Sequence, residues 1–196
     1  MANWVNTTIR LHHGSEAAYS TFKALQEKIT EIENSGNKPT RNDSFVVGFD
    51  LVFEEFNGLS YEETLGSRTI NLRSHGDEIY MESAWSYPSP AVFHIAKLIM
   101  AVDPKAIIST KFIEESLAFV GFEVYTNYEL VGDEEFTPED LADDYDLEFD
   151  EDEGVDVETQ ERIDEILDNE IKDVVREILS DNEWVKFYFQ IEPITV

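Results

Sequence analysis

Hydrophobic and polar positions in the first 130 residues follow two kinds of periodicity. Some segments alternate every second residue, as half-buried strands do, and others repeat apolar residues every three or four positions, as amphipathic helices do. Residues 45–56 are apolar with a mixed period, which predicts irregular structure or a short strand. The predicted order is strand, helix, two strands, helix and two strands, at residues 4–11, 19–32, 68–74, 78–85, 91–102, 106–113 and 119–130.

Two local signals refine this pattern. His75-Gly76-Asp77 places glycine and aspartate where a hairpin between residues 68–74 and 78–85 needs a turn. Gly121 interrupts the last strand and predicts a bulge or a close approach of another segment. The order strand, helix, two strands, helix, strand is that of an α+β, ferredoxin-like split βαβ fold, in which two helices cover one face of an antiparallel sheet.

A helix and a strand are predicted near the C-terminal end. Residues 163–179 keep apolar residues at every third or fourth position and acids on the other faces, so we expect an amphipathic helix that docks by one side. The aromatic-rich residues 184–191 predict a final strand that adds to the sheet. We therefore expect a ferredoxin-like domain over residues 1–130. An extension over residues 131–196 should pack on the same domain, with an acidic segment, a helix and a strand.

Charge changes this picture most. The 196 residues hold 43 acids against 14 lysines and arginines, a net charge of −29. Because polyanions are bound by basic side chains that displace counterions, this balance argues against direct binding to nucleic acid or anionic lipid and favours a basic protein partner. Disulfides and thiolate metal sites are excluded because the chain has no cysteine. With no signal-peptide pattern and no apolar run near about 18 residues, we expect a soluble, cytoplasmic protein.

The negative charge is concentrated between residues 133 and 161, which hold sixteen acids and no base. If this stretch is extended, residues two apart are roughly 6.6 to 6.8 Å apart, so alternating acids form a row with Tyr145, Leu147 and Phe149 behind it. Such a row resembles the phosphates of a nucleic-acid strand, which lie about 3.4 Å apart along the axis. A DNA mimic is one interpretation, and a solvated linker or disordered acidic loop is the other. The alternating acids are Asp144, Asp146, Glu148, Asp150 and Asp152.

We predict that acids of this stretch and of the exposed face of the following helix contact the partner. The predicted contact residues are Asp143, Asp144, Asp146, Glu148, Asp150, Glu151, Asp152, Glu153, Asp164, Glu165 and Asp168.

No motif in the sequence predicts catalysis or a cofactor. Asp144-x-Asp146-x-Glu148 begins like a calcium loop, but Phe149 stands where that loop needs glycine, so only loose binding of divalent cations is expected. Metalloprotease, nucleophile-elbow and phosphate-loop motifs are absent, and we expect neither an enzyme nor a specific metal site. Surface or capping roles are expected for His12, His13, His75 and His94, and packing on the sheet for Trp4, Trp85 and Trp184.

Four short motifs carry a resemblance to a known family. They are Asn3-Trp4-Val5-Asn6, then Ser83-Ala84-Trp85-Ser86-Tyr87-Pro88-Ser89-Pro90 before the second helix, Glu114-Glu115, and Phe119-Val120-Gly121. In this order and spacing they resemble the YubB-type ferredoxin-like family of phage and plasmid proteins, over residues 1–130. A cysteine near Val5 and a proline-rich turn near Phe53, usual in that family, are absent here. The resemblance implies a small mobile-element protein in a bacterial host cell, with no enzymatic activity to carry over.

Charge, pattern and resemblance together favour an inhibitory function. We expect a phage or plasmid counter-defence protein whose DNA-mimicking acidic surface occupies the nucleic-acid groove of a host enzyme. The partner is then a basic nucleic-acid-binding protein, such as a restriction nuclease, a CRISPR effector or a toxin that modifies DNA. The alternative is an interaction or regulatory protein of the phage cycle that binds a basic partner without mimicking DNA. The sequence predicts no particular oligomeric state.

Overall fold

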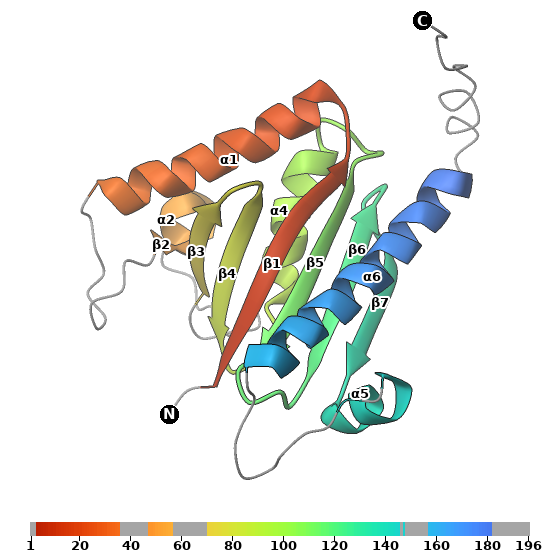
Figure 1. Cartoon of the computed structure of the whole chain (residues 1–196). Helices are drawn as coiled ribbons and strands as arrows, with labels where there is room; N and C mark the ends of the chain where they lie inside the picture. Colours follow the sequence, from red (N-terminus) through yellow and green to blue (C-terminus); the bar gives the residue numbers. More distant parts are fainter. Residues whose placement is uncertain (1–2, 36–46, 57–69, 146, 148–156, 182–196) are drawn as a thin grey trace, which may run out of the picture.

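An antiparallel sheet of seven strands forms the centre of the described structure (Figure 1). It is seen in a computed structural model of the chain, in which residues 3–35, 47–56, 70–145, 147 and 157–181 are described. The strands lie in the order β2-β3-β4-β1-β5-β6-β7, and each neighbouring pair is antiparallel. They are β1 (Trp4–His13), β2 (Val47–Gly48), β3 (Ile70–His75), β4 (Glu78–Ala84), β5 (Ile107–Glu114), β6 (Val120–Thr126) and β7 (Glu129–Phe136).

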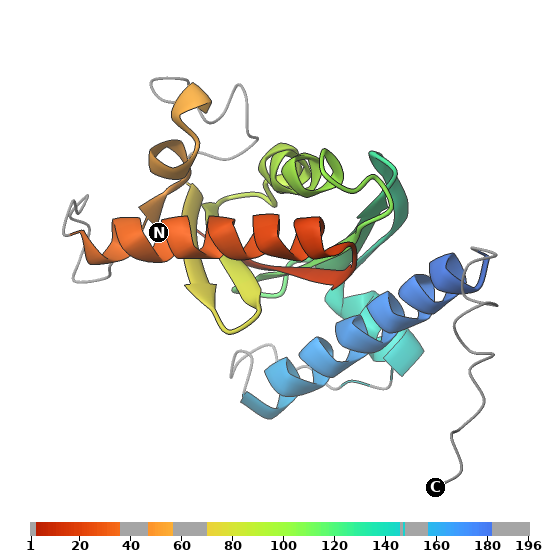
Figure 2. The same ribbon diagram turned by 90° about the horizontal axis from the view of Figure 1, so that it is seen from above.

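Helices cover both faces of this sheet (Figure 2). The helices α1 (Glu16–Asn34) and α4 (Ser89–Met100) lie on one face, and the long α6 (Val157–Asp181) lies on the other. Shorter elements are α2 (Phe49–Val52), the 3-10 helix η1 (Glu54–Phe56) and α5 (Pro138–Tyr145). The predicted α+β class is confirmed, with a sheet that is larger than a four-stranded ferredoxin-like core. Among the described helices, none is both long and apolar enough to span a bilayer.

The predictions of β1, α1, β3, β4, α4 and β5 are confirmed, and local sequence explains these elements. The prediction of irregular structure or a short strand over residues 45–56 holds only for β2, because the residues after it form α2 and η1. The alternation over residues 4–11 forms β1, in which Val5 and Ile9 are fully buried. The side chain of Ser15 caps α1 by accepting a hydrogen bond from the Ala18 amide at 3.4 Å. The predicted hairpin is β3–β4, and Gly76 closes its turn with a φ of +62°.

The prediction of one strand over residues 119–130 is wrong. The structure divides this segment into β6 and β7, joined at Asn127 and Tyr128, whose φ angles are +51° and +64°. Hairpin turns of this kind need two positive φ angles and usually contain glycine, which is absent here. The turn is instead held by tertiary contacts, because the Asn127 amide donates to the Pro104 carbonyl at 2.7 Å and the Tyr128 hydroxyl donates to the Met100 carbonyl at 2.8 Å.

The acidic stretch begins inside the sheet. Asp133, Glu134 and Glu135 belong to β7, so the first acids of this stretch are part of the sheet, and the predicted domain boundary at residue 130 falls within this strand. β7 pairs with β6 along its whole length, apart from a bulge at Val131. The final strand predicted over residues 184–191 lies outside the described residues.

The sheet separates two hydrophobic cores. One lies beneath α1 and α4 and contains Phe22, Ile9 and Ile95. The other lies between α6 and the strands β5, β6 and β7. Every fourth residue on one side of α6 is buried against these strands, which confirms the predicted amphipathic helix; these residues are Ile163, Leu167, Ile171 and Val175.

Candidate partner-binding surface

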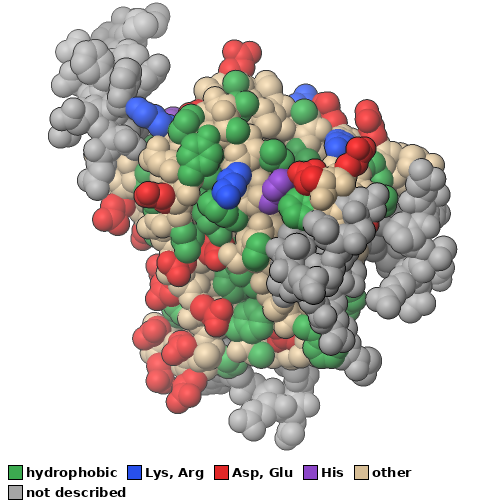
Figure 3. All heavy atoms as spheres, turned by 180° about the vertical axis from the view of Figure 1, so that it is seen from behind, with side chains coloured by type: hydrophobic (Ala, Val, Ile, Leu, Met, Phe, Trp, Pro, Cys, Tyr) green, Lys and Arg blue, Asp and Glu red, His purple; other side chains and the backbone are tan. Residues whose placement is uncertain are grey.

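Exposed acids follow one another along β7 and α5. Residues 129–145 contain eight acids and no lysine, arginine or histidine, and all eight acids are exposed. Figure 3 shows acidic side chains gathered at this side of the molecule, at the lower left of the view. We call this set the β7–α5 acidic surface: Glu129, Asp133, Glu134, Glu135, Glu139, Asp140, Asp143 and Asp144.

Local sequence fixes α5 as a helix. Thr137 caps it, because the Thr137 hydroxyl accepts from the Asp140 amide at 3.3 Å while Asp140 Oδ2 accepts from the Thr137 amide at 2.8 Å. The Thr137 hydroxyl also donates to Asp140 Oδ2 at 2.7 Å, and this bond, followed by the one from the Thr137 amide, holds the pKa of Asp140 below its usual value. Pro138 suits the first helical position, and Leu141 is fully buried. The acids of α5 are therefore presented from a docked helix.

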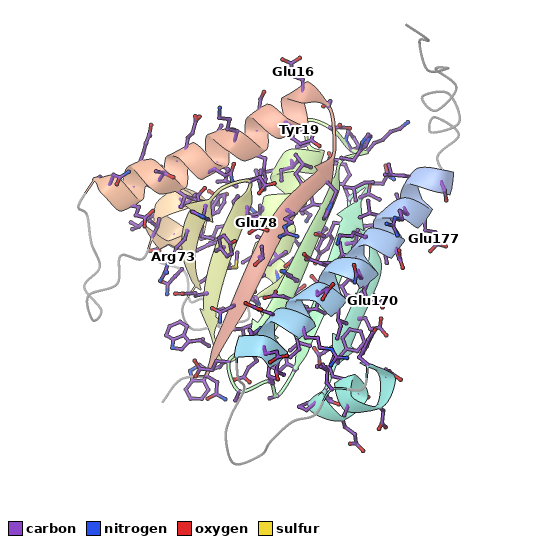
Figure 4. All side chains as sticks on the ribbon, viewed as in Figure 1. Glu16, Tyr19, Arg73, Glu78, Glu170 and Glu177 are labelled. Atoms are coloured by element: carbon purple, nitrogen blue, oxygen red, sulfur yellow. The ribbon has the colours of Figure 1, made fainter. Side chains whose placement is uncertain are left out.

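Like charges meet where β7 faces α6. Burial raises the pKa of the Glu134 carboxyl, and the negative charges of Glu170, Asp144 and Asp133 raise it further. Figure 4 shows Glu170 on α6, beside β7. The Tyr145 hydroxyl donates to Glu170 Oε1 at 2.9 Å. Burial, followed by this hydrogen bond, raises the pKa of Tyr145. The charged groups that shift the pKa of Glu134 are all acids, and none of them is a cation that would relieve the repulsion.

The first residue of the predicted carboxylate row, Asp144, is not in an extended strand. Asp143 and Asp144 are exposed as expected, but they lie in α5, so the prediction of an extended strand at Asp144 is wrong. The Thr137 cap and the anchoring of Leu141 stabilise helix over the alternation that suggested a strand. Leu147 is 4% exposed, which confirms the apolar anchor expected there. The predicted contacts Asp146, Glu148, Asp150, Glu151, Asp152 and Glu153, and the apolar Phe149, lie outside the described residues.

The predicted contacts on α6 have different environments. Glu165 is exposed, whereas Asp164 and Asp168 pair with basic residues of the sheet. Lys111 Nζ of β5 lies 2.8 Å from Asp164 Oδ1 and 3.1 Å from Asp168 Oδ1. Arg10 Nη1 of β1 donates to both oxygens of Asp168, at 3.1 and 3.2 Å. Asp168 therefore already has intramolecular partners, so its carboxylate is less available to another protein.

Sequence reasoning missed this ion-pair network. It continues across the sheet, because Arg10 Nε also pairs with Glu78 of β4, and the Tyr80 hydroxyl donates to Glu78. That hydrogen bond raises the pKa of Tyr80 to about 12. The available signal was Lys111, the one basic residue of the predicted strand over residues 106–113, together with two aspartates four residues apart on the docking helix.

We expect Asp168→Asn to make the stability of the protein less dependent on pH. Burial alone raises the pKa of Asp168, but the hydrogen bond and charge of Lys111, and then Arg10, lower it overall. A folded-state pKa below the unfolded value of about 3.9 means that the carboxylate stabilises the fold above that pH and loses its contribution as pH falls through the folded pKa. Urea unfolding should show the variant about 1–2 kcal/mol less stable at pH 7, with the gap narrowing toward pH 3.

The matched control for this experiment is Glu165→Gln, at the exposed acid three residues earlier. It should leave the free energy of unfolding within about 0.5 kcal/mol of the original at both pH values. A gap between the Asp168→Asn and original proteins that stays constant from pH 7 to pH 3 would contradict the assigned role of this carboxylate.

The described histidines lie apart from the acidic surface. His12 Nε2 lies 2.7 Å from Ser109 Oγ, and the His94 ring lies edge-on to Phe53 and Phe56, at 4.9 and 4.8 Å between ring centroids. Burial lowers the pKa of both histidines. Among the described residues, no group of three or more histidines and acids is arranged to hold a metal ion.

A pocket of about 380 Å³ lies elsewhere, on the β1-β4-β3 part of the sheet. Its lining includes Asn6, His75 and Glu82, and Arg73 pairs with Glu82 at 3.1 Å. This pocket mixes both charges and is not part of the β7–α5 acidic surface.

The motifs that carry the family resemblance meet at one end of the sheet. The Trp85 amide donates to the Asn3 carbonyl at 2.8 Å, and the Glu115 amide donates to the Trp4 carbonyl at 2.9 Å. Trp85 is 53% exposed with a φ of +77°, so the packing role predicted for it is not what the structure shows. Comparisons with models of known protein families, with curated proteins and with solved structures match none of them to this chain.

Proposed function

We propose that this protein binds and inhibits a basic, nucleic-acid-binding protein of a bacterial host through the β7–α5 acidic surface. The observation that carries the proposal is the run of eight exposed acids without a base on two consecutive elements. The environment of Glu134 supports it, because its pKa is raised first by burial and then by the negative charges of Glu170, Asp144 and Asp133. A surface of this kind attracts a cationic partner from a distance and speeds association at low salt.

Mimicry of DNA is the form of this function that we favour. On β7, acids two residues apart are roughly 6.6 to 6.8 Å apart, and on α5 acids three or four apart have Cβ atoms about 5–6 Å apart. Carboxylates presented at these intervals by ordered elements can stand in for a line of phosphates in a groove that binds nucleic acid. The partner is then a restriction nuclease, a CRISPR effector or a DNA-modifying toxin, and the protein acts as a phage or plasmid counter-defence factor in the host cytoplasm.

A second candidate is an interaction or regulatory protein of the phage cycle that binds a basic partner without mimicking DNA. The helical position of Asp144 favours it, because the predicted straight row of carboxylates does not include this residue.

We further propose that residues 1–130 are built on a ferredoxin-like core, as the YubB-type resemblance implies. The order β3-β4-β1-β5 supports this, together with α1 between β1 and β3 and α4 between β4 and β5 in the chain. In this proposal β2, β6 and β7 enlarge the core, and α6 covers its second face.

Competition with DNA tests the proposed function. A panel of purified restriction nucleases, CRISPR effectors and DNA-modifying toxins is titrated with the protein, and a partner should lose activity and release the protein when double- or single-stranded DNA is added. Replacing Asp143 and Asp144 by asparagine should weaken binding about tenfold and reduce its salt dependence. If DNA does not displace the protein, mimicry is wrong and the second candidate remains.

The matched control removes the same charge from the opposite side of the molecule. Glu27 and Glu31 are exposed acids on α1, and their replacement by glutamine changes the net charge equally. Equal weakening by both pairs would mean that overall charge, and not the β7–α5 acidic surface, decides binding.

A further inference from the structure

The outer edge of β7 has no strand beside it among the described residues. β7 is the last strand of the sheet and pairs only with β6. In Figure 1, α6 crosses in front of the strand and α5 lies at its lower end. Half of the backbone amides and carbonyls of an edge strand point away from its neighbour and can pair with another extended chain.

The usual protections of a sheet edge are only partly present on β7. The strand contains eight residues but neither proline nor lysine. Its one irregularity is the bulge at Val131, which bounds a regular stretch from Gly132 to Phe136. Seven of the eight residues are not buried. The regular stretch is long enough for a partner strand of about five residues.

The charges of this regular stretch decide what kind of strand fits. Glu135 pairs with Gly121 and Glu134 pairs with Phe122, so these two acids lie on opposite faces of the sheet. Asp133 lies on the same face as Glu135. An added strand therefore meets carboxylates above and below its own plane, and opposite charges across neighbouring strands stabilise the pair.

A second copy of this chain does not fit the edge. Pairing β7 with another β7 would set acids against acids, and each chain already carries a net charge of −29. Like charges directly opposite one another destabilise a strand pair.

We propose that the outer edge of β7 accepts a lysine- or arginine-rich extended segment of the partner protein as an added strand over Gly132–Phe136. Backbone hydrogen bonds fix its register, and the acids on both faces select its basic side chains. This inference rests on the proposed function and adds the mode of binding. The acids of α5 then assist by steering, whereas those of β7 contact the bound segment.

The test uses the full chain and two synthetic peptides of equal charge. One alternates lysine with valine, and the other alternates lysine with proline, which lacks the amide hydrogens that a strand must donate. Binding is measured by titration, and amide hydrogen exchange is followed along the chain. The lysine–valine peptide should bind at least tenfold more tightly and should slow exchange in residues 132–136. Equal binding by the two peptides, or no change of exchange in β7, would overturn strand addition.

Two variant pairs separate this inference from the proposed function. Asp133→Asn with Glu135→Gln removes two charges from the edge, and Asp143→Asn with Asp144→Asn removes two from α5. The edge pair should weaken the lysine–valine peptide at least tenfold and the α5 pair about twofold to threefold. Equal weakening by both pairs leaves the acidic surface as the binding site but refutes pairing at the edge. If neither peptide binds the original protein, both proposals fail.

Hydrogen exchange of the free protein identifies the competing occupants. The informative amides of residues 132–136 are those that point away from β6. Slow exchange of these amides without peptide, abolished by removing residues 182–196, would assign the edge to the chain's own C-terminal segment and overturn the proposal. Slow exchange that appears only at high protein concentration would assign the edge to a second copy of the chain and would also overturn the proposal. The expected result is fast exchange of these outward-pointing amides at all concentrations, slowed by the lysine–valine peptide, while the amides bonded to β6 stay slow throughout.

Discussion

Leu167→Ala is expected to lower the free energy of unfolding by about 2–5 kcal/mol. Leu167 is fully buried in the core that α6 forms with the strands β5, β6 and β7. Alanine removes the contacts of a buried side chain and leaves a cavity that the rigid sheet cannot fill. Urea unfolding followed by circular dichroism measures the change, and hydrogen exchange along α6 should show whether this helix opens before the rest of the fold.

Leu98→Ala is the matched control for this prediction. Leu98 lies on α4 and is 39% exposed, so the same chemical change removes less buried surface and leaves no closed cavity. Its effect should stay below about 1 kcal/mol. Equal losses in the two variants would show that α6 is not held on the sheet by its apolar stripe.

Gly121→Ala is expected to destabilise the sheet by about 1–3 kcal/mol or more. A Cβ atom at this position would lie 2.3 Å from the Glu134 carbonyl oxygen and 2.7 Å from Cζ of Phe112. The first of these neighbours is backbone of β7 and cannot rotate away, so the strand itself must move. Thermal and urea unfolding would measure the loss, and the shift in the amide resonances of β7 would locate it.

Gly76→Ala separates this clash from the ordinary cost of replacing glycine. Gly76 needs its positive φ of +62°, but a Cβ atom there has no neighbour within 4 Å. Its variant should therefore lose about 1 kcal/mol through backbone conformation alone. The expectation for Gly121 fails if its variant is as stable as that of Gly76.

Local pattern was sufficient for the elements that depend on their own residues. The alternation of Val5 and Ile9 predicted β1, and the spacing of Ile163, Leu167 and Ile171 predicted the docking face of α6. Gly121 was expected to permit a close approach, and this is confirmed by the Glu134 carbonyl beside it. Each of these features follows from side-chain period or from the absence of a side chain.

Features that depend on distant residues could not be predicted in this way. The turn between β6 and β7 is held by hydrogen bonds from Asn127 to Pro104 and from Tyr128 to Met100. Both acceptors lie more than twenty residues earlier in the chain. Asp168 looked like an exposed acid, but its environment is set by Lys111 and Arg10, which are far away in sequence. The alternation that begins at Asp144 suggested a strand. The residue that caps α5, Thr137, lies before the alternating segment, so that segment alone did not reveal the helix.

The central position of β1 has a consequence for synthesis of the chain. β1 leaves the ribosome before the other described strands, but its two neighbours in the sheet are β4 and β5, so it is paired on both sides only after residue 114. Residues 1–128 hold 17 of the 43 acids and 10 of the 14 basic residues, a net charge of −7, whereas residues 129–196 carry −22. Most of the negative charge is therefore translated after the central strands can already have assembled. Self-repulsion then acts mainly on the late docking of α6, and much less on the formation of the sheet that receives it.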